Sequence, residues 1–93
     1  MERLIVLKIS TQSEELQTVT IKLEGEILEP FVETVRDACK KWQSRAKCVR
    51  LDLAGVSYVD AAGARLLSDL MRAGVQVAAC SNFISELLRH ERV

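Results

Sequence analysis

Glycine and histidine are scarce in this 93-residue chain, and the shortage of each excludes a class of site. The four glycines, at positions 25, 55, 63 and 74, are isolated, whereas a nucleotide-binding loop needs closely spaced glycines whose backbone N–H groups surround phosphate. The one histidine, His90, is expected at a solvated helix end, so neither a Ser/His/Asp triad nor a histidine metal site has its parts. The sequence therefore predicts no cofactor and no metal.

Cysteine is also sparse, and its spacing is irregular. Cys39, Cys48 and Cys80 are odd in number and form no C-x-x-C pair, which argues against a disulfide framework and a zinc site. We expect three reduced thiols that are mostly packed. Apolar runs are too short for a transmembrane span, and the residues after Met1 do not fit a signal peptide. These features predict a cytoplasmic protein.

An excess of one charge is missing as well, because 13 basic residues balance 13 acidic ones. Because the chain has no net charge, it has no overall electrostatic field that would attract a polyanion. Neither nucleic acid nor an anionic membrane surface is therefore a predicted partner. The length allows one hydrophobic core, and 48% hydrophobic with 28% charged residues is typical of a folded domain. We predict a single domain over residues 1–93, with no insertion into a membrane.

Hydrophobic periodicity predicts four strands and three helices. The polar stretch "TQSEE" between the first two strands reads as a hairpin turn, and Pro30 suits a first helical turn. In chain order the elements are strands at 4–10 and 18–23, a helix at about 30–45, a strand at 48–53, a helix from Ala61 to about Gly74, a strand at 75–80 and a helix capped by Ser81.

The order of these elements predicts the fold. Strands separated by helices imply right-handed parallel crossovers, while the first two strands form a hairpin. Each strand alternates between apolar and polar residues, which indicates that helices cover only one sheet face. We predict an α/β fold with a mixed four-stranded sheet, in the order strand, strand, helix, strand, helix, strand, helix, with the helices packed on one face.

The segment "VSYVDAAGARLL", residues 56–67, forms a strand-to-helix corner. Asp60 is placed to cap the helix by accepting from a free backbone N–H of residue 62 or 63. Small residues at 61–63 leave the helix start uncovered, so another protein could approach the backbone there. Tight packing of the helix end against the sheet explains them equally well. For Tyr58, partner contact and partial burial with a wet hydroxyl both stay open.

Two hypotheses concern chemistry. Asp52, Asp60 and Cys48 could line the pocket of a small-ligand binder or enzyme, which predicts a deep concave site with strongly perturbed pKa values. An acid/base pair is disfavoured because Asp52 faces outward and helix capping accounts for Asp60. Ser57 and Ser68, close to the corner, are candidates for regulatory phosphorylation.

The run "CVRLDLAGVSYVDAAGARLLSDLMRAGVQVAAC" resembles the centre of a STAS domain, the family of sulfate transporter domains and bacterial anti-sigma-factor antagonists. There a strand ending in "LDLsgV", an Asp-Ser-Ser/Thr-Gly loop, a helix and a further strand recur in this order. The earlier "IKLEGEILEPFVETVRDACKKW" is similar to the family's second strand, turn and first long helix. The resemblance covers about residues 18–88.

In antagonists of this family, the second residue after the aspartate is commonly the serine or threonine that a partner kinase, itself the anti-sigma factor, phosphorylates. The matching residue is Ala62, which has no hydroxyl, so a phosphoswitch at this position is excluded. The resemblance implies a non-enzymatic interaction module that docks a protein partner such as an anti-sigma factor of the histidine-kinase-like ATPase type. The partner-binding residues that it implies are Ser57, Tyr58, Asp60, Ala61, Ala62, Gly63, Ala64, Arg65 and Leu66.

The same resemblance supports an alternative of another kind. The chain could be an accessory subunit of a larger assembly, stressosome-like or a lipid-transport ATPase complex, with the corner as a structural dock. A homodimer is a further option. The helix opens with "AGARLL" where "GLxxL" is common in the family, which places Arg65 near the surface.

Overall fold

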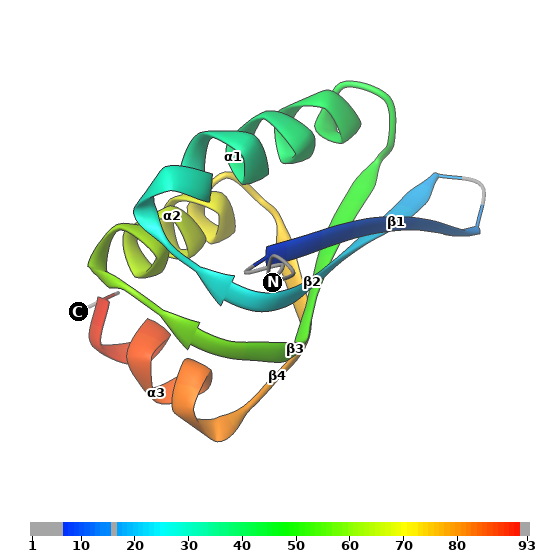
Figure 1. Ribbon diagram of the computed structural model, residues 1–93. Coiled ribbons are helices and arrows are strands. Elements are labelled where there is room, and N and C mark those ends of the chain that lie inside the picture. Colours follow the sequence, from blue (N-terminus) through cyan, green and yellow to red (C-terminus); the bar gives the residue numbers. More distant parts are fainter. Residues whose placement is uncertain (1–6, 16, 92–93) are drawn as a thin grey trace, which may run out of the picture.

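The computed structural model describes residues 7–15 and 17–91, except for the side chains of residues 13–15, 83 and 88–91 (Figure 1). Its elements are β1 (Leu7–Glu15), β2 (Thr18–Ile27), α1 (Glu29–Gln43), β3 (Cys48–Val59), α2 (Ala61–Arg72), β4 (Gln76–Cys80) and α3 (Asn82–Glu91). The strands form one sheet in the order β1-β2-β3-β4. β1 is antiparallel to β2, and the β2–β3 and β3–β4 pairs are parallel. The predicted mixed α/β fold is confirmed.

The three helices gather on one side of the curved sheet, with α2 between α1 and α3 (Figure 1). They close one hydrophobic core over the inner face of the two central strands. Its fully buried side chains include Ile21, Leu23 and Ile27 of β2, Leu51 and Leu53 of β3, Val35 and Cys39 of α1, Leu66 and Leu67 of α2, and Ile84 of α3. The central strands alternate buried with less buried residues because helices cover only one face.

The predicted hairpin turn at "TQSEE" is wrong, because residues 11–15 continue β1 and pair with β2. Thr11 lies opposite Ile21 and Glu15 lies opposite Thr18, so the chain reverses between Glu15 and Thr18. Thr11 and Gln12 are exposed. A run of exposed polar strand residues has the same composition as a turn, which is why the sequence predicted one here. Residues 4–6 of the predicted strand at 4–10 lie outside the described residues.

β3 is also longer than the predicted strand at 48–53, since it runs on to Val59. The register between β2 and β3 shifts twice, between Lys22 and Glu24 and between Gly25 and Glu26. Each irregularity changes which residue faces the core, so the buried positions after Leu53 are Val56 and Val59. Because β3 does not alternate strictly after Leu53, the hydrophobic pattern of the sequence predicted a strand only as far as that residue.

The helix boundaries follow the predicted signals. Pro30 lies in the first turn of α1, and Gly74 after α2 has a φ of 103°, a conformation that favours glycine. The Ser81 hydroxyl accepts a hydrogen bond from the Ile84 N–H at 3.2 Å and so caps α3 as predicted. Across residues 7–15 and 17–91, none of the helices is both long and apolar enough to cross a membrane.

Candidate functional site

Asp60 connects the first turns of two helices. Its Oδ1 accepts the Gly63 N–H at 2.7 Å, which confirms the predicted cap of α2. Its Oδ2 accepts the Glu29 N–H at 2.8 Å at the start of α1, where Leu28 provides no side-chain cap. The Asp60 N–H in turn donates to the Ile27 carbonyl at 3.1 Å. The sequence did not indicate the link to α1, because the two partners are 31 residues apart.

At Gly63, α2 comes very close to the end of β2. A Cβ at this position would lie 2.5 Å from the Ile27 carbonyl oxygen and 2.8 Å from Val59 Cγ1, closer than such atoms approach in proteins. The residue is buried. Tight packing, one of the two interpretations that the sequence left open, therefore accounts for Gly63.

The predicted corner surface divides into exposed and buried residues. Ser57, Tyr58, Ala61 and Arg65 are exposed, and Asp60 and Ala62 are partly buried. Of the predicted partner-binding residues, Gly63, Ala64 and Leu66 are buried, because the first turns of α2 direct them into the interior. Tyr58 is 47% exposed, which leaves one side of its ring open to solvent or a partner.

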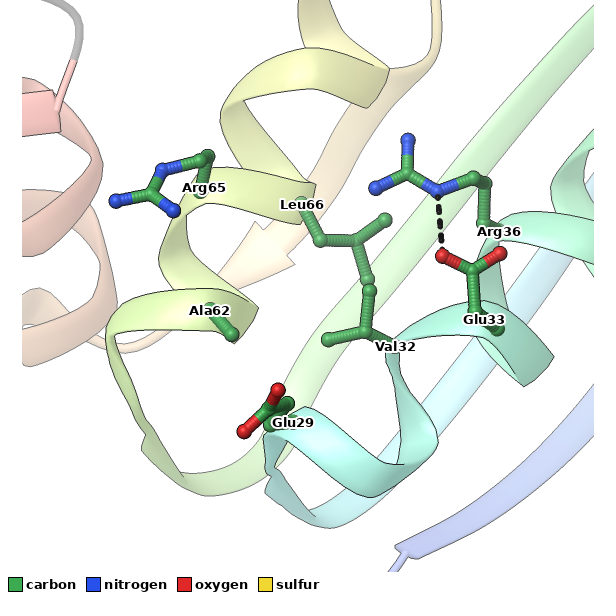
Figure 2. Close-up of a pocket in the computed structure, with 7 residues that line it drawn as sticks. All are labelled: Glu29, Val32, Glu33, Arg36, Ala62, Arg65 and Leu66. Carbon is green, nitrogen blue, oxygen red and sulfur yellow. Dashed lines mark ion pairs between the residues drawn. The ribbon is translucent and has the colours of Figure 1, made fainter.

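A surface groove of about 250 Å³ lies beside Ala62, between α1 and the start of α2 (Figure 2). The Val32 and Leu66 side chains point toward each other across it, and the Glu33 carboxylate pairs with the Arg36 guanidinium at 3.6 Å on its rim. The residues that line the groove are Glu29, Val32, Glu33, Arg36, Ala62, Arg65 and Leu66.

Sequence reasoning missed the part of the groove that α1 supplies. One signal was present, because α1 follows β2, α2 follows β3, and the two strands are parallel neighbours. Helices that follow adjacent parallel strands begin at the same edge of the sheet. The four α1 residues that line the groove, Glu29, Val32, Glu33 and Arg36, are therefore brought to the corner by the topology.

The structure does not bring Asp52, Asp60 and Cys48 together. Cys48 begins β3 whereas Asp60 follows its end, and the Asp52 carboxylate accepts the nearby Ala54 N–H at 3.0 Å. None of the three lines the groove, which is smaller than the ~300–1,000 Å³ typical of small-molecule pockets. Within the described part of the chain, no group of three or more His, Cys, Asp or Glu residues is arranged to hold a metal ion.

The two serines proposed for phosphorylation differ in access. Ser57 is exposed and its hydroxyl donates to the Gly25 carbonyl at 3.3 Å. Ser68, in contrast, is 2% exposed, and its hydroxyl accepts from Arg72 Nη2 at 3.3 Å. A kinase therefore cannot reach Ser68 in the folded chain, and the prediction of Ser68 as a phosphorylation site is wrong. The predicted solvated side chain of His90 lies outside the described side chains.

The three cysteines are free thiols, as predicted. Cys39 is fully buried, whereas Cys48 and Cys80 are partly buried. Burial raises the pKa of the Cys39 thiol from 9.0 to about 11. This shifted group lies in the hydrophobic core rather than at the corner, so it marks packing and not a reactive site.

A family model described as "Mlab, STAS domain" matches residues 10–90. The chain belongs to the STAS domain family. No curated protein matches it in sequence. The resemblance noted in the sequence is thereby confirmed.

Similar solved structures agree with this assignment. The unphosphorylated anti-sigma factor antagonist SpoIIAA is 21% identical with a TM-score of 0.68, covering 88% of this chain and 82% of that one. The phosphorylated form of SpoIIAA, a Bacillus cell fate determinant, is 20% identical with a TM-score of 0.69, covering 90% and 83%. The crystal structure of Mglu is 26% identical with a TM-score of 0.67, covering 78% of this STAS domain but 20% of Mglu. The SpoIIAA likenesses establish the fold.

Proposed function

We propose that this STAS domain is a non-enzymatic protein-interaction module whose partner docks on the corner surface, defined as Ser57, Tyr58, Asp60, Ala61, Ala62 and Arg65 together with the groove. The observation that carries the proposal is the position of Ala62, which lines a groove between two helices whose starts are both held by Asp60. Such a groove is preformed, so a partner would pay little ordering entropy to use it.

The proposed partner is an anti-sigma factor of the histidine-kinase-like ATPase type, in the cytoplasm. The fold likeness to the antagonist SpoIIAA supports this choice. Because Ala62 cannot accept a phosphoryl group, the proposed antagonist would not be switched off at this position. Any phosphorylation near the corner would have to use another hydroxyl, and Ser57 is an exposed one.

Ala62 also favours a second candidate, an accessory subunit of a larger assembly such as a stressosome-like complex or a lipid-transport ATPase. A subunit that stays in its complex needs a dock but no phosphoswitch. Both candidates use the corner surface, so they differ in the identity of the partner.

Site-specific photocrosslinking in the source cell tests the function. A photoreactive amino acid replaces Ala61 or Arg65, both exposed on the corner, and in a control chain it replaces Lys47, exposed in the segment between α1 and β3. We expect covalent adducts with one protein from the two corner positions and not from Lys47. Mass spectrometry then identifies that protein.

The identity of the crosslinked protein separates the candidates. An ATPase that binds a sigma factor supports the antagonist, and a transporter ATPase or another STAS protein supports the accessory subunit. Equal adducts from all three positions, or none from the corner, would overturn the corner surface as the dock.

A further inference from the structure

The mouth of the groove carries an acidic group that the rest of the site does not neutralise. Glu33 already pairs with Arg36, whereas within the described part of the chain the Glu29 carboxylate has no hydrogen bond or ion pair. In Figure 2 the Glu29 side chain points toward Ala62, while the guanidinium of Arg65, which also lines the groove, points away from Glu29. The mouth therefore presents a negative charge beside an apolar surface.

The position of that charge is fixed by the backbone. Glu29 is the first residue of α1, and its N–H is held by the Asp60 carboxylate at 2.8 Å. Both Asp60 oxygens accept backbone N–H groups and Asp60 does not line the groove, so Glu29 is the acid at its mouth that is left for a ligand. Glu29 is exposed and free to meet a cation from outside.

The groove is small, and its apolar lining lies between charged side chains. Val32 and Leu66 are 9% and 0% exposed and form its floor with Ala62. A groove of about 250 Å³ is below the usual size of a small-molecule site, and it has room for one or two side chains of another protein. Aliphatic side chains gain most from burial on such a floor.

We infer that the groove receives an aliphatic side chain of the partner and that Glu29 pairs with a lysine or arginine next to it. This inference rests on the proposed function and adds the chemistry of the docking segment. Because the apolar floor and the carboxylate are adjacent, both contacts can come from neighbouring residues of one segment. The charge would mainly set orientation and association rate, and the aliphatic side chain would supply most of the affinity.

The experiment selects binders from a library of random 12-residue peptides displayed on phage, using the full chain as bait. We expect the selected peptides to contain an aliphatic residue within one helical turn of a lysine or arginine. Synthetic copies titrated into the ¹⁵N-labelled chain should shift the amide signals of residues that line the groove. Binding should weaken with added salt.

Charge reversal provides the decisive comparison. Glu29→Lys should weaken the selected peptides roughly tenfold, the scale expected when a partly exposed attraction becomes a repulsion. Glu29→Gln should have a smaller effect in the same direction. Asp37→Lys, a matched change at an exposed acid farther along the same helix and outside the groove, should alter the affinity less than about twofold.

The outcomes distinguish this inference from the proposed function. Peptides that occupy the groove without a basic residue, or that bind Glu29→Lys unchanged, would overturn the inference alone. Peptides that bind elsewhere would also overturn it. If the corner positions Ala61 and Arg65 then yield no crosslinks either, the proposed function falls with it.

Discussion

Both oxygens of the Asp60 carboxylate accept a backbone N–H, one from each helix that borders the groove. A single side chain thus satisfies donors that the helix geometry of α1 and α2 leaves free. The consequence is that Asp60 shapes the groove from within, even though it belongs to the corner surface. Loss of binding in an Asp60 variant would therefore report a change in structure as well as a lost contact.

Replacement of Asp60 by alanine should be destabilising. We expect Asp60→Ala to lower the free energy of unfolding by about 2 kcal/mol, since it removes one helix cap and one further hydrogen bond to a carboxylate. Urea denaturation measures this change. Asp60→Asn keeps one oxygen acceptor and should lose less. An Asp60→Ala chain as stable as the wild type would contradict the bridging role.

Gly63 permits a second test at the residue scale. Gly63→Ala should lower the free energy of unfolding by about 1–3 kcal/mol, because the added Cβ would meet the Ile27 carbonyl oxygen at 2.5 Å. Thermal and urea unfolding measure the loss.

Gly55→Ala is the matched control for that change. The added Cβ would lie 2.9 Å from Glu24 Cγ, part of a flexible and partly exposed side chain that can move aside. We expect an effect within about 0.5 kcal/mol of zero. Equal costs at Gly63 and Gly55 would show that the contact with Ile27 is not what requires glycine.

At the scale of elements, the helices obtain their N-terminal caps in different ways. α1 borrows its acceptor from Asp60, far away in the chain, whereas α3 has a local cap in Ser81. Local caps can be identified in a sequence because donor and acceptor are three residues apart. A borrowed cap depends on the packing of the whole domain.

Because the cap of α3 is local, its removal should affect mainly the first turn of that helix. Ser81→Ala should speed the hydrogen exchange of the Ile84 amide and destabilise the chain by about 1 kcal/mol, since it removes the acceptor for that N–H. Ser81→Asp, which keeps a side-chain oxygen, should retain the protection of the Ile84 amide against hydrogen exchange. Unchanged exchange at Ile84 in Ser81→Ala would show that the hydroxyl does not stabilise the first turn.

At the scale of the whole molecule, the buried Cys39 thiol links global stability to pH. Burial raises its pKa from 9.0 to about 11 in the folded chain. The thiol of the unfolded chain ionises first as the pH rises, so the unfolded state is favoured progressively. The contribution of Cys39 is complete below pH 9 and is lost between about pH 9 and 11, a change of roughly 3 kcal/mol.

Urea unfolding at a series of pH values measures this effect. The wild type should lose stability from pH 9 upward, and Cys39→Ala, although less stable at pH 7, should show a smaller decrease over the same interval. Parallel pH profiles of the two chains would exclude Cys39 as the source. The two chains are compared by how steeply the free energy of unfolding falls with pH, because the cavity in the alanine variant lowers its stability at every pH.

Much of the fold could be predicted because its signals are local. The alternation at Val49, Leu51 and Leu53 and the helical spacing of Leu66, Leu67 and Leu70 each depend on neighbours within a few residues. The turn at "TQSEE" was wrong because exposed strand residues and turn residues share the same polar composition. Ser68 was a wrong candidate for phosphorylation because a serine can be exposed or buried, and here its hydroxyl is buried and accepts from Arg72.

The sequence by itself determined the order of the elements, the cap of α2 by Asp60 and the absence of a hydroxyl at position 62, since each depends on the identity of one residue or on short spacing. Only the tertiary structure decided that Gly63 and Ala64 are buried, that Asp60 also holds α1, and that Glu29 stands at the mouth of a groove with Ala62. The physical reason is that these contacts join segments about 30 residues apart, which meet because parallel strands deliver both helix starts to one edge of the sheet.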